Sequence, residues 1–183
     1  MATVTDWNVI LTVVPGPRHV SEVLGALARF GRFSPTSFND VCVGRVSDVP
    51  ATLEAIGHAR ALQKDWGLAV GHVVFVETTF AFEPDRLVDE VKRRAQPLCE
   101  RVPEGSVCVR VKRRGLAGRV HSQQVEQAIA EHIITMAESA GKRLSVSLSD
   151  PDYVIVIETL DAVAGIGLIT RAQRERYPFM AVR

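Results

Sequence analysis

The spacing of apolar residues in the first half of the chain alternates between the period of a strand and that of a helix. The run from Trp7 to Val14 is apolar and β-branched and is closed by Pro15–Gly16–Pro17, which predicts a buried strand followed by a turn. The elements predicted next are a helix from Val20 that Gly31 ends, a strand at 38–46, a helix from Pro50 to Trp66–Gly67, and a strand at 68–82.

The second half continues in the same way. After Glu83–Pro84–Asp85, an apolar stripe that includes Leu87, Val91 and Ala95 predicts a helix, which Pro97 is expected to break or kink. The other predicted elements are a strand at 106–112, a helix from Ser122 as its N-cap to Gly141, strands at 143–148, 153–159 and 163–170, and a polar, basic tail at 171–183. The fold class predicted is a mixed α/β fold of the α+β type.

The stretch from Ser106 to Gly115 combines a strand pattern with dense positive charge. Val107, Val109 and Val111 alternate with polar positions, and the strand runs into Arg113 and Arg114. A basic strand end beside the N-terminus of a helix is suited to binding phosphate, because guanidinium groups and backbone N–H groups converge there. The alternative is a solvated strand face without a ligand.

Charge is distributed unevenly although the net charge is only +1. Residues 1–83 contain six Lys or Arg and eight Asp or Glu, whereas residues 84–183 contain sixteen and thirteen. Basic residues cluster at 92–94, 110–114 and 142–143. The second half is therefore the better candidate for binding a polyanion.

The N-terminal stretch has no basic segment before a long apolar run, so neither a signal peptide nor a membrane span is predicted, and a cytoplasmic protein is expected. Cys42, Cys99 and Cys108 have no C-x-x-C spacing and are interpreted as reduced, buried thiols. No cofactor is expected.

Known catalytic motifs are absent from the sequence: there is no G-x-S-x-G, H-E-x-x-H, Walker loop or G-x-G-x-x-G. The five histidines are scattered without metal-ligand spacing, so neither catalytic residues nor metal ligands are assigned. Asp150 and Asp152 flank Pro151 in a predicted turn, where carboxylates usually bind the backbone.

The residues are better suited to binding nucleic acid than to catalysis or metal binding. Several basic side chains at the strand end can neutralise phosphates without reading bases; they are Arg110, Lys112, Arg113, Arg114 and Arg119. Tyr and Trp number two each, and neither Trp lies in the second half, which disfavours reading of stacked bases. Recognition of RNA shape and backbone is the remaining interpretation.

Residues 84–183 resemble a THUMP domain, the RNA-binding module of several tRNA-modification proteins. Three pieces in order carry the resemblance: VRVKRRG at 109–115, HSQQVEQAIAEHI at 121–133 and LSVSLSDPDYVIVIE at 144–158. The resemblance implies helices packed on a small twisted sheet at 83–183, preceded by a ferredoxin-like domain at 1–82.

The resemblance also implies a function. The two domains would bind the acceptor-stem region of tRNA, and a separate modification enzyme acting in trans would do the chemistry, with the layout most similar to the adaptor of tRNA cytidine acetyltransferase. The candidate RNA contacts are then Arg110, Lys112, Arg113, Arg114, Arg119 and Ser122, joined by Lys142 and Arg143 through charge and expected proximity.

Two alternatives from other classes stay open. The first is a small enzyme with a site between the halves, built from His72, His121 or the Asp150 and Asp152 pair. The second is a protein-interaction module whose basic surface meets an acidic partner. The sequence does not specify the RNA, the modification, the partner or the oligomeric state.

Overall fold

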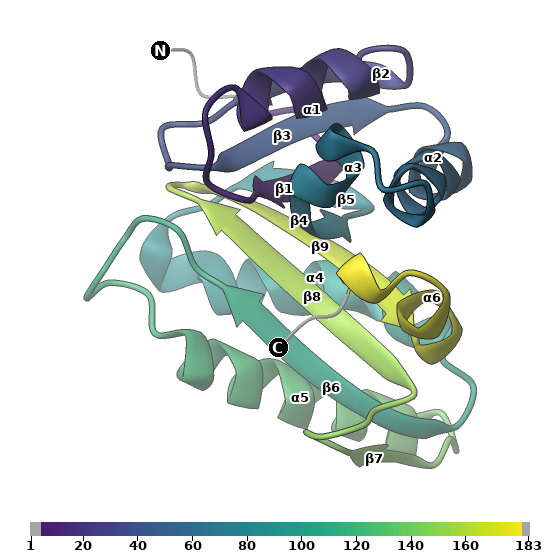
Figure 1. Cartoon of the computed structure of the whole chain (residues 1–183). Coiled ribbons are helices and arrows are strands. Elements are labelled where there is room, and N and C mark those ends of the chain that lie inside the picture. The colour runs from purple at the N-terminus through teal and green to yellow at the C-terminus, as the bar shows by residue number, and fades with distance from the viewer. Residues whose placement is uncertain (1–4, 181–183) are drawn as a thin grey trace. The chain divides into compact units, whose positions relative to one another are not determined.

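A computed structural model describes residues 5–180, which form two compact units (Figure 1). The first unit extends to Phe75 and includes the segment that begins at Arg176, whereas the second runs from Val76 to Glu175. Each unit is built on its own sheet flanked by helices, which confirms the mixed α/β fold class. The division into domains at residues 82 and 83 stays a prediction.

The first unit has the ferredoxin-like order of elements, βαββαβ, with one added short helix. Its strand order is β2-β3-β1-β4, and all neighbouring strands are antiparallel. The elements are β1 (Val9–Val13), α1 (His19–Leu27), β2 (Gly31–Pro35), β3 (Val41–Val46), α2 (Val49–Ala61), α3 (Asp65–Ala69) and β4 (Val70–Phe75). The Asp48 side chain accepts a hydrogen bond from the Ala51 N–H at 2.9 Å and so caps α2.

The second unit has a five-stranded sheet in the order β5-β9-β8-β6-β7. Strand β6 is parallel to both of its neighbours, while β9 is antiparallel to β8 and β5. The elements are β5 (Thr78–Ala81), η1 (Pro84–Arg86), α4 (Leu87–Glu100), β6 (Gly105–Lys112), α5 (Ser122–Ser139), β7 (Leu144–Val146), β8 (Tyr153–Leu160), β9 (Val163–Thr170) and α6 (Arg171–Arg176).

The core of the second unit lies between one face of this sheet and the helices α4 and α5 (Figure 1). Val91 and Ala95 of α4 and Ile129 and Ile133 of α5 are fully buried against apolar strand residues. The predicted packing of helices on a small sheet is therefore confirmed, and it holds β6 and α5 against each other in one core.

The elements differ from the predicted ones in three places. The β-prone run at 68–82 is not one strand, because α3 takes its start and the rest is divided between β4 in the first sheet and β5 in the second. Residues 31–35 form the edge strand β2, which contains a glycine and a proline and so lacks a strand signal. Helix α4 continues through Pro97, which lies exposed in its last turn, to Glu100, so the helix is not broken there.

The segment after β9 is more ordered than the sequence predicts. Helix α6 leads into η2 (Pro178–Met180), whose Phe179 and Met180 are buried in the first unit. The Tyr177 hydroxyl and the Arg176 guanidinium both donate to the carboxylate of Glu54. Aromatic burial and these two hydrogen bonds therefore hold η2 in place.

Candidate nucleic-acid interface

Strand β6 has one face in the core and one face that carries charge. Val107, Val109 and Val111 contact the core of the second unit, while Arg110 and Lys112 lie on the other face. The predicted alternation is confirmed. Lys112 is the last residue of the strand, where the chain leaves the sheet.

The connection between β6 and α5 is named the basic loop here and comprises residues 112–122. Gly115 and Gly118 both have positive φ angles, which glycine adopts at no steric cost. A Cβ atom at Gly115 would overlap with the side chain of Asp161 in the β8–β9 turn. The loop is docked on that turn by the backbone as well, since Arg114 O accepts from the Asp161 N–H at 2.9 Å.

Helix α5 begins at the end of this loop. Its N-cap is His121, which makes no side-chain capping bond, so the prediction of Ser122 as N-cap was wrong by one residue and Ser122 is the first helical residue. The first helical hydrogen bond runs from the Val125 N–H to the His121 carbonyl at 3.1 Å. The N–H groups that precede it carry the partial positive charge of the helix terminus.

The Arg114 side chain is bound within the protein. Its guanidinium forms an ion pair with Glu158 on β8, and the two side chains are 12% and 5% exposed. Burial raises the pKa of the Glu158 carboxyl, and the charges of Arg114 and Lys112 oppose that shift. The structure therefore gives Arg114 a role inside the protein that sequence reasoning did not predict.

The other basic side chains of the loop are more available. Arg113 is partly exposed and donates to the Gly115 carbonyl within the loop. Lys112 and Arg119 are exposed, and neither side chain makes an ion pair or hydrogen bond with another residue in the part of the chain that the structure describes. These side chains are therefore accessible to an anionic ligand, and the loop that carries them leads into the free N–H groups of α5.

Three of the predicted contact residues lie outside the basic loop: Arg110, Lys142 and Arg143. The Arg110 guanidinium donates to the Leu148 carbonyl at 2.7 Å. The Lys142 ammonium donates to carbonyls at the end of α4, to Glu100 at 2.8 Å and Val102 at 2.9 Å. It therefore caps that helix.

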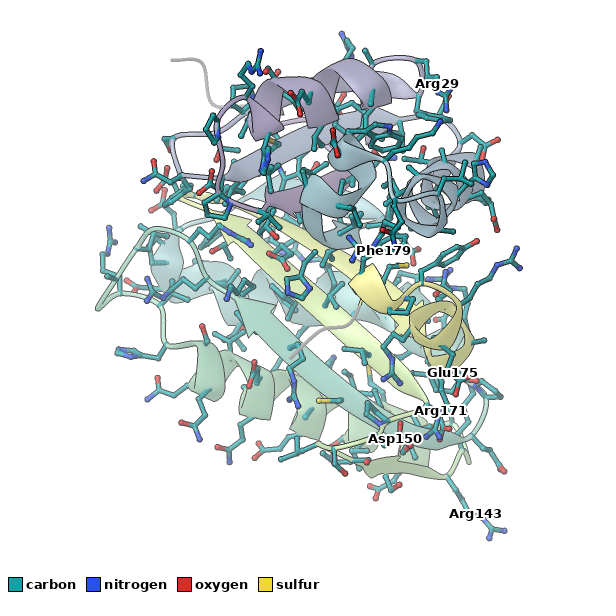
Figure 2. All side chains as sticks on the ribbon, viewed as in Figure 1. Arg29, Arg143, Asp150, Arg171, Glu175 and Phe179 are labelled. Carbon is teal, nitrogen blue, oxygen red and sulfur yellow. The ribbon has the colours of Figure 1, made fainter. Side chains whose placement is uncertain are left out.

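Arg143 is exposed and extends away from the ribbon beside β7 (Figure 2). Because β7 pairs with the start of β6 at Gly105, Arg143 lies about 23 Å along the strand from Lys112. The expected proximity of Lys142 and Arg143 to the basic loop was therefore wrong. The cluster at 92–94 is also partly neutralised, since Arg93 and Arg94 both pair with Glu90.

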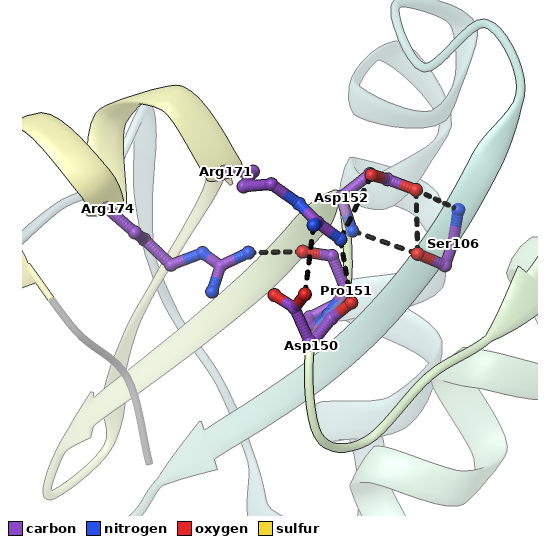
Figure 3. Close-up of polar contacts among 6 residues, drawn as sticks. All are labelled: Ser106, Asp150, Pro151, Asp152, Arg171 and Arg174. Atoms are coloured by element: carbon purple, nitrogen blue, oxygen red, sulfur yellow. Dashed lines mark hydrogen bonds and ion pairs between the residues drawn. The ribbon is translucent and has the colours of Figure 1, made fainter.

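Asp150 and Asp152 do not form a free acid and base pair. The Arg171 guanidinium pairs with Asp150 at 2.9 Å and with Asp152 at 3.2 Å (Figure 3). Asp152 also accepts hydrogen bonds from the Ser106 N–H at 2.8 Å and from its hydroxyl at 2.7 Å. These hydrogen bonds hold the pKa of Asp152 below its ordinary value, with the Ser106 hydroxyl as the main cause.

Together these contacts fasten the 150–152 turn to β6 and to the start of α6. The Arg174 guanidinium adds to them by donating to the Pro151 carbonyl (Figure 3). The turn therefore has a structural role, which removes this pair as the ready acid and base of the enzyme alternative.

The cysteines are free and buried, as predicted. Burial raises the pKa of both Cys42 and Cys99 to about 11 and also raises that of Cys108. Among residues 5–180, no group of three or more His, Cys, Asp or Glu side chains could hold a metal ion. No helix in the described part of the chain is both long and apolar enough to span a bilayer.

Comparison with solved structures identifies several similar folds. TrmN from Thermus thermophilus matches with a TM-score of 0.61 and 15% identity over 87% of this chain and 44% of its own. PH1313 from Pyrococcus horikoshii matches with a TM-score of 0.58 and 11% identity over 90% of this chain and 55% of its own.

A 4-thiouridine synthetase, solved with RNA and ATP, matches with a TM-score of 0.56 and 13% identity over 90% of this chain and 41% of its own. The chain thus spans about half the length of these structures or less. At these identities the likeness shows the fold.

The sequence comparison agrees with the fold. No curated protein matches the chain by sequence. The family model of the THUMP domain, however, matches residues 85–168, a range that contains α4, β6, the basic loop, α5, β7 and β8 and most of β9. Residues 85–168 of this chain are therefore a THUMP domain.

Proposed function

We propose that this protein binds structured RNA, in the first place the acceptor-stem region of tRNA, and presents it to a separate tRNA-modification enzyme. The observation that carries the proposal is the basic loop, which contains Lys112, Arg113 and Arg119 and leads into the uncapped N-terminus of α5 within a THUMP domain. Support for RNA as the ligand comes from the 4-thiouridine synthetase, a structure of similar fold that was solved with RNA.

The mode of binding is electrostatic docking of phosphates with little reading of bases. Arginine, lysine and helix N-termini are the usual phosphate ligands in protein–nucleic acid complexes. Stacking platforms are scarce in the second unit, since Phe80 and Phe82 are buried in its core. Affinity is therefore expected to depend steeply on salt and only weakly on base sequence.

The test replaces Lys112, Arg113 and Arg119 together by alanine. Arg110 and Arg114 are left intact because their guanidinium groups form hydrogen bonds with other residues, to the Leu148 carbonyl and the Glu158 carboxylate. Arg143→Ala is the matched control, since it removes an exposed basic side chain of the same unit at the far end of β6.

Binding of unmodified tRNA is measured by filter retention over a series of salt concentrations. The triple variant is expected to bind at least about tenfold more weakly. The slope of log affinity against log salt should fall by about 0.7 to 0.9 for each phosphate group that the variant no longer binds. Equal affinity and equal slope for the triple variant and the wild type would refute the proposal.

A second arm addresses the adaptor role. If the protein presents tRNA to an enzyme, the purified chain binds tRNA without modifying it, and modification appears only when a host extract is added. Modification of tRNA by the purified chain alone would contradict this part and leave the RNA site standing.

A further inference from the structure

Strand β6 has a free edge beyond the end of β7. Strand β8 pairs with β6 from Val107 to Lys112, but β7 pairs with it only from Gly105 to Val107, and the Ser147 N–H adds one more bond to the Val107 carbonyl. Backbone groups of alternate residues point to the same side of a strand, so those of Val109 and Val111 face this open side.

Two charged side chains form hydrogen bonds with backbone groups of these residues, where a neighbouring strand would otherwise pair. The Val111 N–H donates to the carboxylate of Glu126 on α5 at 2.8 Å, and the Val109 carbonyl accepts from the Arg110 guanidinium at 3.3 Å. Charged side chains at an edge limit uncontrolled strand pairing. A peptide strand could replace both hydrogen bonds with backbone ones.

A cavity of about 580 Å³ opens beside this edge, between α5 and the segment after β7. Ala130 and Ile134 of α5 line one wall, and Val146 and Leu148 line another. Val146 is 49% exposed and Leu148 is 67% exposed, which is unusual for two large apolar side chains so close together. An apolar groove along an open strand edge is the setting in which proteins add an extended peptide as a further strand.

The charged side chains that line the groove carry a net charge of −1. Glu126 and Glu131 contribute two negative charges and Arg110 one positive charge, and the Arg110 guanidinium donates to the carbonyls of Leu148 and Val109. This charge repels the backbone of a nucleic acid and attracts lysine or arginine. The groove therefore differs in chemistry from the basic loop.

We propose that this groove binds an extended, basic segment of a partner protein, which adds as a short strand to the edge of β6 at Val109 and Val111. Apolar side chains of the segment would cover Leu148 and Val146, and a lysine or arginine would face Glu126 and Glu131. The inference goes beyond RNA binding and does not depend on it.

The test selects peptides of about ten residues, the upper range of strand length, from a random phage library on the full-length chain. Parallel selections use Leu148→Lys, which replaces an apolar contact by a repelling charge, and Leu62→Lys, a control at an exposed leucine of the first unit. Both positions are exposed, so both variants are expected to fold.

The wild type and the Leu62→Lys variant should enrich the same peptides, with alternating apolar residues and at least one lysine or arginine. In fluorescence anisotropy, each enriched peptide should bind Leu148→Lys at least about tenfold more weakly than the wild type. Glu126→Gln should also weaken binding, and the amide NMR signals of Val109 and Val111 should shift on addition of peptide.

Three results would overturn the proposal. One is the absence of any sequence enriched over the Leu148→Lys selection. Another is equal binding of the enriched peptides to Leu148→Lys and the wild type. The third is competitive displacement of the peptide by tRNA, which would make the groove part of the RNA surface.

Discussion

Arg114 and Glu158 form an ion pair that joins the basic loop to the central strand of the second sheet, and both side chains are almost completely buried. A buried charge without its partner is far less stable than the pair, because the desolvation cost stays while the attraction disappears. The pair therefore ties the conformation of the basic loop to the stability of the sheet.

The first prediction concerns this pair. Arg114→Ala should lower the free energy of unfolding by about 3–5 kcal/mol, because it leaves the Glu158 carboxylate buried alone. Arg119→Ala, in the same loop but exposed, should change it by less than about 0.5 kcal/mol. Urea unfolding followed by circular dichroism measures both, and equal stability of the two variants would contradict the assignment.

The second prediction compares two adjacent basic residues. Lys142→Met should cost about 1–3 kcal/mol, because it removes charge-assisted hydrogen bonds to the carbonyls at the end of α4. Arg143→Met should be nearly neutral, since Arg143 is exposed on the surface. Thermal melts of the two variants provide the comparison, and a Tm for Lys142→Met as high as that of Arg143→Met would count against the cap.

The third prediction concerns acid stability. Because its pKa is lowered in the folded state, Asp152 contributes stability that is fully present above about pH 4 and is lost as the pH falls through that lowered pKa. Ser106→Ala removes the hydroxyl that contributes most, so the pKa should rise toward its ordinary value and acid unfolding should begin at a higher pH.

Carbon NMR of the Asp152 carboxyl during a pH titration measures this change directly. Ser145→Ala, at an exposed position of β7, is the control and should leave the titration unchanged. An unaltered Asp152 pKa in Ser106→Ala would show that the hydrogen bond is not its cause.

The fourth prediction concerns the thiols. With pKa values of about 11, Cys42 and Cys99 hold only about one thiolate in a thousand at pH 8, and both are buried. A disulfide reagent such as DTNB should therefore react with the native protein slowly and with all three thiols after unfolding in guanidinium chloride. Rapid labelling of the native protein would contradict the buried positions.

Much of the second unit could be predicted from the sequence, because its signals are local. Strand β6 and helix α5 each carry a clear period, whereas β8 and β9 are short, largely apolar runs bounded by turn residues. The division of the run at 68–82 could not be predicted, since it depends on pairing of Thr78 with Ile166, far away in the sequence. Apolar periodicity carries no information on which sheet a strand joins.

In the candidate site, too, the sequence predicted what is local and not what depends on contacts between distant residues. The sequence places Lys112, Arg113 and Arg119 in one loop because they are neighbours in the chain. It could not show that Arg114 meets Glu158 or that Lys142 reaches the end of α4, since each contact joins residues about forty positions apart. Charge alone therefore did not distinguish the basic side chains that bind other residues of the fold from those that do not.

The pairing of β5 with β9 has a consequence for synthesis on the ribosome. Strand β5 is the first of its sheet to be made, yet within residues 5–180 the strand that pairs with it is β9, the last. Until β9 has emerged, β5 has no strand of its sheet to pair with and one edge of β8 stays open, and unpaired strand edges invite aggregation. Nascent chains truncated before β9 should consequently depend on chaperones, whereas release of the completed sheet ends that dependence.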